Sequence, residues 1–415
     1  MIDTLVTDRK DLRVLLLEGI NESALDLFAA AGFERVERLT KALDGDDLRK
    51  AVADAHVLGI RSRTRITADV LVAAPQLMTI GCFSVGTNQV DIRAARKHGI
   101  PVFNAPFSNT RSVAELVIGE IVMLLRNIFT KSNAAHAGGW DKSADGSFEV
   151  RGKTLGIVGY GNIGSQLAGL AEAMGMRVIF FDMTDKLRRG NVEPTDTLEE
   201  LLAKSDIVSL HVPDTPATRN MIRAEHLRAM KKGAYLINNA RGEVVDIDAL
   251  ADALKSGHLR GAAIDVFPVE PGSNKEKFVS PLQGLPNVIL TPHIGGSTEE
   301  AQERIGSEVA RKLADYAETG ATFGAVGFPQ VQLPPHAGGT RFVHIHRNVP
   351  GVLTRLNQIF AGRNLNIAAQ YLQTDADVGY VVVDADGAEA ERAQVYDEMG
   401  KIDGTIRTRL LYYKG

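Results

Sequence analysis

This chain of 415 residues contains a single cysteine, Cys82. One cysteine excludes a disulfide within the chain, and so low a content is typical of proteins of the reducing cytoplasm, where we expect this chain to act. Cys82 is either a reactive thiol or a buried, inert one. Its apolar neighbours in the segment LMTIGCF favour the inert form.

Long apolar runs and a strong net charge are also missing. No uninterrupted apolar stretch approaches the ~18 residues of a membrane span, and the N-terminal sequence mixes charged with apolar residues and lacks the core of a signal peptide. The formal net charge of −4 gives no general attraction to nucleic acid or to an anionic membrane surface. We therefore expect neither a membrane nor a nucleic acid as partner, and no metal site.

What the chain does contain is an alternation of strand and helix patterns. Its length exceeds the about 250–300 residues at which single hydrophobic cores stop growing, so two or three domains are expected. The expected strands cover 12–18, 56–60, 77–82, 207–210, 234–238, 261–265 and 287–290, and the expected helices 23–31, 91–98 and 298–318. This alternation predicts an α/β fold.

The segment LGIVGYGNIGSQLAGLAEAMGMRVIFFD, residues 155–182, carries the most specific pattern. A short apolar strand leads into glycines at G-x-G-x-x-G spacing, then a helical pattern over 163–174 and a second strand over 177–181 that ends at Asp182. Strand, glycine-rich turn, helix, second strand and terminal acid in this order predict a dinucleotide-binding unit.

Each residue of this motif has a mechanical role toward a dinucleotide. Gly159 permits the tight turn, and Gly161 lets the backbone approach the pyrophosphate. Gly164 lets the helix pack closely on the strand, with its N-terminal N–H groups aimed at the phosphates. Asp182 favours NAD over NADP, because a ribose 2′-phosphate would meet like charge there. The expected cofactor-binding residues of this motif are Gly159, Gly161, Asn162, Ile163, Gly164 and Asp182.

Three further polar residues follow predicted strands of the same region: Arg241, Glu270 and His293. Ligands of open parallel sheets bind at the carboxyl ends of the strands, so we expect the three side chains at one edge. Taken singly, His293 is equally consistent with a loop histidine and Glu270 with a solvated charge. Together they indicate an acid–base site, in which an imidazole takes a proton as an alcohol is oxidised and a carboxylate stabilises the charged ring. Arg241 suits a substrate carboxylate.

Residues 319–340 are rich in glycine and proline and predict a linker. Beyond it, apolar patterns over 341–415 follow the order β-α-β-β-α-β, which is that of a ferredoxin-like α+β sandwich.

These motifs resemble those of the D-isomer-specific 2-hydroxyacid dehydrogenases. The stretches that carry the resemblance are GCFSVGTNQVD (81–91), FNAPFSNTRSVAEL (103–116), LGIVGYGNIG (155–164), NNARGEVVD (238–246), AAIDVFPVEP (262–271) and LTPHIGGST (290–298). The C-terminal stretches HIHRNVPGVL (344–353) and LNIAAQYLQT (365–374) resemble a regulatory ACT domain. The resemblance covers nearly the whole chain.

The resemblance implies an arrangement of domains. Residues 1–109 and 297–330 are expected to form a flavodoxin-like substrate-binding domain, and 110–296 a Rossmann-type NAD-binding domain. Residues 331–340 would be the linker and 341–415 the ACT domain.

The resemblance also implies roles for individual residues. His293 is the acid–base residue, Glu270 its partner and Arg241 the anchor for the substrate carboxylate and keto oxygen. Asp265 corresponds to an acid near the nicotinamide carboxamide. The residues implied around the substrate are Arg61, Ser62, Arg63, Ser84, Val85, Gly86 and Asn109.

The turn Arg61–Ser62–Arg63 suits a phosphate ester, since guanidinium and hydroxyl groups bind phosphate oxygens; the alternative is three solvated loop residues. The implied reaction is therefore the NAD-dependent oxidation of D-3-phosphoglycerate to 3-phosphohydroxypyruvate, the first step of phosphorylated L-serine synthesis. Reduction of 2-oxoglutarate to 2-hydroxyglutarate is a further expected activity. The alternatives are a dehydrogenase of another D-2-hydroxy acid and a non-catalytic NAD-sensing regulator.

Regulation and assembly are implied as well. L-serine is the expected effector, held between two ACT domains by His346, Asn348 and Asn366; the alternative is an ACT domain kept only for oligomerisation. The family has an arm that packs on a neighbouring subunit where this chain has its only tryptophan, Trp140. We expect Trp140 to be an exposed anchor in a homo-oligomer, expected to be a tetramer; the alternative is a partly buried residue of the monomer.

The chain departs from the family pattern in two places. Arg347 and Val349 stand where the serine-regulated form has an acid and an arginine. Asn239 and Ala240 stand where Ala or Thr and then Ser are usual, with little expected effect on Arg241.

Overall fold

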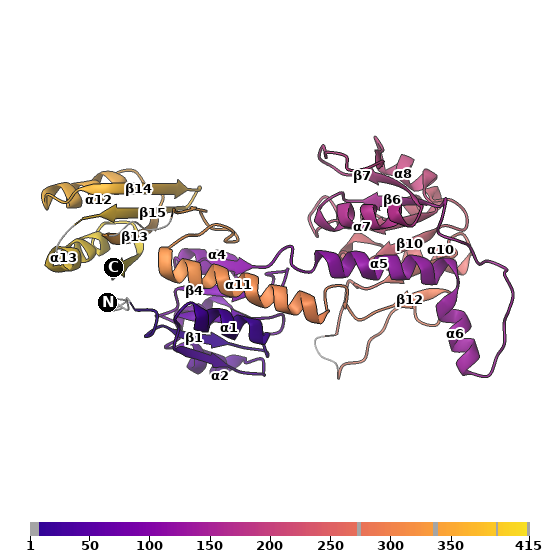
Figure 1. Ribbon diagram of the computed structural model, residues 1–415, viewed down its shortest axis with the longest axis horizontal. Coiled ribbons are helices and arrows are strands. Elements are labelled where there is room, and N and C mark those ends of the chain that lie inside the picture. Colours follow the sequence, from indigo (N-terminus) through magenta and orange to yellow (C-terminus); the bar gives the residue numbers. More distant parts are fainter. Residues whose placement is uncertain (1–7, 272–274, 335–338, 387–388, 413–415) are drawn as a thin grey trace. The chain divides into compact units, whose positions relative to one another are not determined.

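The computed structural model describes residues 8–271, 275–334, 339–386 and 389–412. The chain folds into two compact units, Met1–Ser108 with Gln302–Gly415, and Asn109–Ala301. The units contain three sheets (Figure 1). The α/β class is confirmed, with two parallel sheets and one antiparallel sheet at the C-terminus.

The first sheet has the strand order β2-β1-β3-β4-β5, and all its pairs are parallel. Its strands are β1 (Arg13–Leu16), β2 (Arg35–Arg38), β3 (Val57–Ile60), β4 (Thr79–Cys82) and β5 (Val102–Asn104). Its helices are α1 (Glu22–Ala30), α2 (Gly45–Val52), α3 (Ala68–Val72), α4 (Ile92–Lys97) and the long α11 (Glu299–Thr319). Central strands β3 and β4 are buried throughout, as expected of a parallel sheet covered on both faces.

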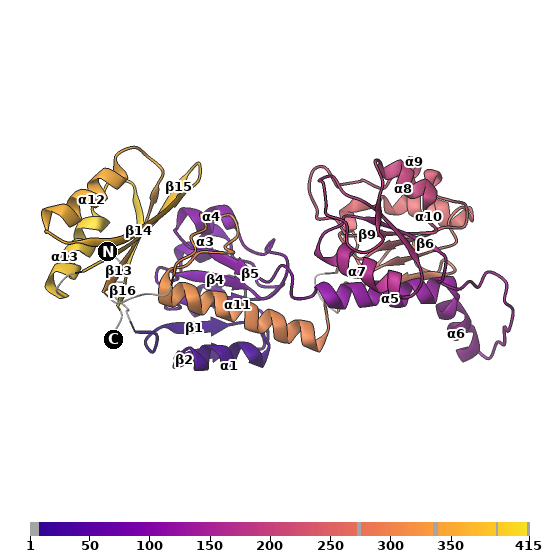
Figure 2. The ribbon, with the colours of Figure 1, turned by 45° about the horizontal axis from the view of Figure 1, so that its top comes forward.

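Helix α11 returns the chain to this first sheet, and its apolar side packs on it (Figure 2). Val309 and Leu313 come so close to Gly81 of β4 that a Cβ on that glycine would lie within 2.7 Å of both side chains. The Thr298 hydroxyl accepts the N–H of Ala301 at 3.1 Å, so Thr298 caps the N-terminus of this helix.

Cys82 at the end of β4 is fully buried, and burial raises the pKa of its thiol to about 12. The expected burial of Cys82 is confirmed, and a buried thiol with a raised pKa favours the inert form.

The second sheet has seven strands in the order β12-β11-β10-β9-β6-β7-β8. They are β6 (Thr154–Val158), β7 (Arg177–Phe181), β8 (Glu193–Pro194), β9 (Ile207–Leu210), β10 (Tyr235–Asn238), β11 (Gly261–Ile264) and β12 (Val288–Leu290). The helices of this unit are α5 (Thr110–Leu125), α6 (Ile128–His136), α7 (Asn162–Ala173), α8 (Leu198–Lys204), α9 (Ala224–Ala229), η1 (Gly242–Val244) and α10 (Ile247–Lys255). The order reverses at β6, between β9 and β7, which is the switch point where such sheets bind ligands.

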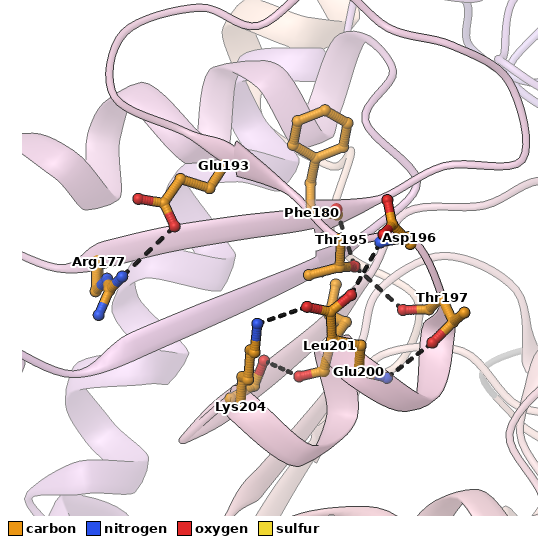
Figure 3. Close-up of polar contacts among 10 residues, drawn as sticks. Arg177, Phe180, Glu193, Thr195, Asp196, Thr197, Glu200, Leu201 and Lys204 are labelled. Atoms are coloured by element: carbon orange, nitrogen blue, oxygen red, sulfur yellow. Dashed lines mark hydrogen bonds and ion pairs between the residues drawn. The ribbon is translucent and has the colours of Figure 1, made fainter.

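The β7–β8 edge of this sheet is held by polar contacts around the start of α8 (Figure 3). Thr197 accepts the N–H of Glu200 at 3.1 Å, and the Glu200 carboxylate accepts the N–H of Asp196 at 3.0 Å. The Thr195 hydroxyl donates to the β7 backbone at 3.3 Å. These contacts fix the end of β7, which Asp182 follows.

The third sheet is antiparallel, with the order β14-β15-β13-β16. Its strands are β13 (Thr340–Arg347), β14 (Ile367–Thr374), β15 (Val378–Ala385) and β16 (Thr405–Tyr412). Helices α12 (Val352–Gly362) and α13 (Glu389–Gly400) cover one face. The other face is buried in one apolar cluster with the end of α11 and the segment after it.

The glycine- and proline-rich segment predicted as a linker is packed over its described part. Thr322, Phe328 and Val331 are buried, and Val331 donates its N–H to the Thr322 hydroxyl at 2.8 Å. Gly324 and Gly327 supply the positive φ angles, 82° and 62°, that let the segment turn tightly. Residues 335–338 of the predicted linker lie outside the described residues. Within the described residues, no helix is both long and apolar enough to cross a membrane.

Candidate active site

His293 and Glu270 meet at the carboxyl edge of the seven-stranded sheet. The His293 Nδ1 lies 2.9 Å from a Glu270 carboxylate oxygen, and the other carboxylate oxygen accepts the Phe267 N–H at 3.0 Å. His293 has a left-handed backbone, with φ of 53°, held by its N–H donating to Asp265 O at 2.8 Å. With Nδ1–H donating to Glu270, Nε2 is the nitrogen with a free lone pair, and the side chain is half exposed.

The two groups stabilise each other's charged forms. The hydrogen bond that His293 donates to Glu270 raises the pKa of His293 above its ordinary value, against the opposing effects of burial and of the Arg241 charge. Burial by itself would raise the pKa of Glu270, but the hydrogen bonds from His293 and Phe267 and the charges of His293 and Arg241 lower it overall. This is the arrangement of an imidazole base with an orienting carboxylate.

Arg241 follows β10, and contacts of Asn238 and Gly242 fix the backbone of the turn that carries it. Asn238 accepts the Ala240 N–H at 3.1 Å and donates its amide to Arg241 O at 3.0 Å. A Cβ on Gly242 would lie 2.1 Å from the Phe267 carbonyl carbon. This close backbone approach joins the Arg241 turn to the segment that carries Glu270, so Gly242 has a structural role that sequence reasoning missed.

Asp265 follows β11 and lies under the His293 loop. Its carboxylate accepts the Thr291 hydroxyl at 2.6 Å and the N–H groups of Ile294 and Gly295 at 2.8 Å each. Arg241, Asp265, Glu270 and His293, predicted from separate motifs, are therefore brought to one edge of the sheet.

The glycine-rich turn between β6 and α7 has the shape of a dinucleotide cradle. Gly159 has φ of 94°, and a Cβ there would lie 2.5 Å from His211 O. A Cβ on Gly164 would lie 2.3 Å from Gly159 O, whereas one on Gly161 would meet nothing within 4 Å. The backbone is thus tightly packed at Gly159 and Gly164, and there is open space beside Gly161. Asn162 and Ile163 form the first residues of α7, whose N-terminus faces the opening.

Asp182 directly follows β7. One carboxylate oxygen accepts the Tyr160 N–H at 2.9 Å, and the other accepts the Thr184 N–H at 3.0 Å and its hydroxyl at 2.9 Å. Asp182 is therefore fixed beside the glycine-rich turn, where it also shapes the loop.

The Arg61–Ser62–Arg63 turn is built on a buried acid that sequence reasoning missed. Glu18 is 3% exposed and accepts the N–H groups of Arg61, Arg63 and Thr64 at 2.8 to 3.2 Å. Burial would raise the pKa of Glu18, but these hydrogen bonds lower it overall. The N–H groups of Arg61 and Arg63 are therefore used internally, while their guanidinium groups belong to the part of the turn that a ligand can meet.

Ser84 and Val85, two other residues predicted to face the substrate, are held by the amide side chains of Gln89 and Asn104. Gln89 is buried and donates its amide to Arg61 O at 2.5 Å and to the Ser84 hydroxyl at 3.1 Å. Asn104 donates its amide to Val85 O at 2.5 Å. Gln89 therefore links the turn to the Ser84–Val85–Gly86 loop, and Asn104 links that loop to β5; neither residue was predicted.

A hollow of about 370 Å³ lies beside Arg61. It is lined by Gly19, Asn21, Glu22, Arg38, Arg61 and Gln302. Arg38 adds a second guanidinium, whose Nη1 lies 3.6 Å from Glu22. Asn109, also predicted to face the substrate, belongs to the other compact unit, where it precedes α5.

The three predicted effector residues do not meet within one chain. His346 is buried and pairs with Gly379 at the start of β15, whereas Asn366 precedes β14, whose Ile367 pairs with Ala385 at the far end of β15. Asn348 is exposed and donates its amide to Asp375 O at 2.7 Å. Burial lowers the pKa of His346 below its ordinary value.

Trp140 is 86% exposed, so the alternative of a partly buried monomer residue is wrong. Helix α6, which precedes it, buries no residue.

Two family descriptions match the chain. The NAD binding domain of D-isomer specific 2-hydroxyacid dehydrogenases matches residues 118–295, and the AHAS small subunit-like ACT domain matches residues 342–407. A solved structure of D-2-hydroxyisocaproate dehydrogenase superposes with a TM-score of 0.69 at 27% identity, covering 76% of this chain and 99% of the other. That of D-lactate dehydrogenase from Aquifex aeolicus, complexed with NAD and lactic acid, has a TM-score of 0.63 at 29% identity, covering 73% and 95%.

This chain belongs to the D-isomer specific 2-hydroxyacid dehydrogenase family and is an NAD-dependent oxidoreductase with an ACT-like C-terminal domain. Among its curated relatives is the D-3-phosphoglycerate dehydrogenase of Haemophilus influenzae, 56% identical over 99% of this chain and 100% of the relative. The D-3-phosphoglycerate dehydrogenase of Escherichia coli K12 is also 56% identical, over 98% of each chain. D-3-phosphoglycerate dehydrogenase 1 of Saccharomyces cerevisiae is 46% identical, over 97% of this chain and 88% of the relative.

The His293–Glu270 contact predicts a shift in pH dependence. Glu270→Gln removes the negative charge that raises the pKa of His293. Since alcohol oxidation needs a neutral imidazole, the acidic limb of the kcat/KM profile for oxidation should move to lower pH, and the maximal rate should fall about tenfold as the imidazolium loses its partner. Steady-state rates from pH 5 to 10 test this; an unmoved acidic limb would contradict the coupling.

Proposed function

We propose that this chain oxidises D-3-phosphoglycerate to 3-phosphohydroxypyruvate with NAD, in the first step of phosphorylated L-serine synthesis. The observation that carries the proposal is the His293–Glu270 pair beside Arg241 at the dinucleotide edge of the sheet, in a chain 56% identical to D-3-phosphoglycerate dehydrogenases. NADH formation from D-3-phosphoglycerate by the purified protein tests it.

The residues around the glycine-rich turn fit NAD. The open space over Gly161 leaves room for a pyrophosphate against the backbone and the α7 N-terminus. In this proposal Asp182 binds the ribose hydroxyls and Asp265 lies near the carboxamide. Bound NAD supplies the acceptor for a hydride.

The protein groups then carry the rest of the reaction. Arg241 binds the substrate carboxylate and the oxygen on C2, which orients the C2–H bond. His293 Nε2 removes the hydroxyl proton, and Glu270 stabilises the imidazolium that forms. Arg61, Ser62 and Arg63 bind the phosphate through their side chains, with Ser84, Val85, Gly86 and Asn109 completing the surroundings of the substrate.

A second reaction, reduction of 2-oxoglutarate to 2-hydroxyglutarate, rests on the same basic turn. A second carboxylate would take the place of the phosphate at the guanidinium groups of Arg61 and Arg63. The non-catalytic alternative is set aside, since the family is one of NAD-dependent dehydrogenases and Arg241, Glu270 and His293 are all present.

Asp182 carries the choice of cofactor. Asp182→Ala should raise KM for NAD about tenfold through loss of charge-assisted hydrogen bonds, and should narrow the preference over NADP. Because Asp182 also accepts the Tyr160 N–H, the Tm of Asp182→Ala is measured alongside KM, to separate loss of this loop contact from loss of the ribose contact. Wild-type protein using NADP as readily as NAD would contradict this role.

We further propose that L-serine inhibits the enzyme by binding between the ACT domains of two subunits. His346 and Asn366 lie at opposite ends of β15, so a site that uses both draws them from different chains. The exposed Trp140 and α6 supply a second contact between subunits, giving a homo-oligomer, which we propose to be a tetramer in the cytoplasm. Asn348 donates a hydrogen bond to the Asp375 carbonyl, and the Asp375 carboxylate pairs with Arg96 of α4. These contacts connect the proposed effector site to the domain of the first sheet.

This predicts that Asn348→Ala abolishes inhibition by L-serine while leaving uninhibited turnover near the wild-type value. Coupling of this kind is typically worth ~1–3 kcal/mol. Lys401→Ala, an exposed change after α13, is the control and should keep full inhibition. Turnover rates measured with and without millimolar L-serine, and with other amino acids, test this inhibition. A wild-type chain insensitive to all of them would leave the ACT domain a role in oligomerisation alone.

A further inference from the structure

A buried acid and a buried amide face each other behind the candidate active site. Glu120 of α5 is 0% exposed, and Asn239 after β10 is 7% exposed. The Asn239 Nδ2 donates to Glu120 Oε2 at 3.0 Å. The remaining oxygens, Glu120 Oε1 and Asn239 Oδ1, are buried and have no hydrogen-bond partner among the described residues. Two acceptors are thus left without a donor, an arrangement that native cores avoid.

The surroundings favour a neutral acid. Burial raises the pKa of Glu120 to about 8. The negative charge of Asp265, after β11, also raises this pKa, whereas the hydrogen bond from Asn239 lowers it. Asp265 accepts three hydrogen bonds of its own. The elements packed beside α5 contribute apolar side chains to the same cluster, including Leu167 of α7, Ile237 of β10, Ala263 of β11 and Ile289 of β12.

We propose that Glu120 carries a proton on Oε1 and donates it to Asn239 Oδ1, closing a ring of two hydrogen bonds that anchors the Arg241 turn to α5. A carboxylic acid and a primary amide each present one donor and one acceptor side by side, so one proton satisfies both unpartnered oxygens at once. A carboxylate offers no such proton and leaves both unsatisfied in an apolar cluster, which is costly.

The ring acts on the site through the turn. The Asn238 side chain closes the turn by hydrogen bonds to Ala240 N and Arg241 O. The neighbouring Asn239 side chain connects the turn to Glu120 of α5. The direction of the Arg241 side chain therefore depends on where Asn239 is held. Glu120 and Asn239 are positioning residues for Arg241, and this part of the inference rests on the proposed function; the protonated ring itself does not.

The ring gives stability a defined pH dependence. The pKa of Glu120 is raised from 4.5 to about 8 on folding, so folding takes up a proton between these values. The stabilisation is fully present below the unfolded pKa and is lost as pH rises through about 8. Glu120→Gln keeps a donor and an acceptor but does not titrate. The unfolding equilibrium constant of the wild type, relative to that of Glu120→Gln, should rise with pH by up to about tenfold per unit across this window.

Infrared difference spectroscopy tests the proton directly. The wild type minus Glu120→Gln spectrum at pH 7 should contain the carbonyl band of a buried carboxylic acid, which shifts in D₂O and disappears above pH 9. A carboxylate band in its place would overturn the ring and mean that water fills the gap between the two oxygens. This readout needs no substrate, so it stands whether or not the chain turns over D-3-phosphoglycerate.

Kinetics test the positioning role. Glu120→Gln should keep KM for the hydroxy acid within about twofold of the wild type, whereas Asn239→Leu should raise it at least about fivefold with unchanged affinity for NAD. Asn239→Leu also leaves a buried acid unpaired and lowers Tm. The double variant Glu120→Leu with Asn239→Leu removes both polar groups and should recover Tm but not KM. Recovery of KM together with Tm would show a purely structural pair and overturn the positioning role.

Discussion

His293→Gln lowers kcat for D-3-phosphoglycerate oxidation by about 10²- to 10⁴-fold, the range expected for loss of a positioned general base. Glutamine approximates the size of the imidazole but cannot accept a proton at neutral pH. The affinity for NAD should stay unchanged, because the glycine-rich turn and Asp182 have no contact with His293 among the described residues.

Single-turnover rates and NAD titrations of the same preparation separate the two effects. His258→Gln is the matched control, since His258 belongs to the same compact unit but bonds Met230 O. Turnover of His293→Gln at the wild-type rate would remove His293 from the chemical step.

Arg241→Ala raises KM for the hydroxy acid by about 10- to 100-fold, the expected loss for charged hydrogen bonds worth ~1.5–3 kcal/mol. Arg241→Lys should recover little of this, because a point charge cannot replace the two parallel N–H groups of the guanidinium. The Asn238 contacts that set the turn are to backbone atoms and remain in both variants.

Steady-state kinetics with varied hydroxy acid at saturating NAD measure the effect. Arg223→Lys, at an exposed position that pairs with Glu225, provides the control for an arginine-to-lysine change. An unaltered KM in Arg241→Ala would show that the substrate carboxylate binds elsewhere.

Local patterns predicted much of the fold from sequence alone. The strand, glycine turn, second strand and terminal acid over 155–182 lie close together in the chain, and each follows from steric or periodic rules. The three residues after β10, β11 and β12 were predicted to converge because parallel strands place their carboxyl ends at one edge, and the structure brings Arg241, Glu270 and His293 there.

Local patterns could not predict contacts between residues that are far apart in the sequence. Glu18 reads as one more acid after a strand, and its contacts with the turn at 61–64 appear only once β1 and β3 pair. Glu120 lies on a helix whose neighbouring buried residues, Val117 and Ile121, are apolar, and its partner Asn239 is 119 residues away. The separation of His346 from Asn366 follows from the strand order of the third sheet, in which β15 lies between β13 and β14.

The predicted linker is a further case. Glycine and proline report backbone freedom and turns, and they predict a flexible spacer when nothing else is known. Here the same residues let the segment after α11 fold back, so that Phe328 and Val331 enter the apolar cluster that one face of the third sheet shares.

The substrate that we propose for this chain is a phosphorylated D-2-hydroxy acid. The most direct measurement is kcat/KM with NAD for D-3-phosphoglycerate, D-glycerate and D-2-hydroxyglutarate on one preparation of the purified protein. We expect D-3-phosphoglycerate to be preferred over D-glycerate by roughly 10⁴-fold, since a site with unpaired guanidinium groups rejects the analogue that lacks the phosphate, and D-2-hydroxyglutarate to lie between them. Equal turnover of D-glycerate, or a preference for D-2-hydroxyglutarate over D-3-phosphoglycerate, would contradict the account.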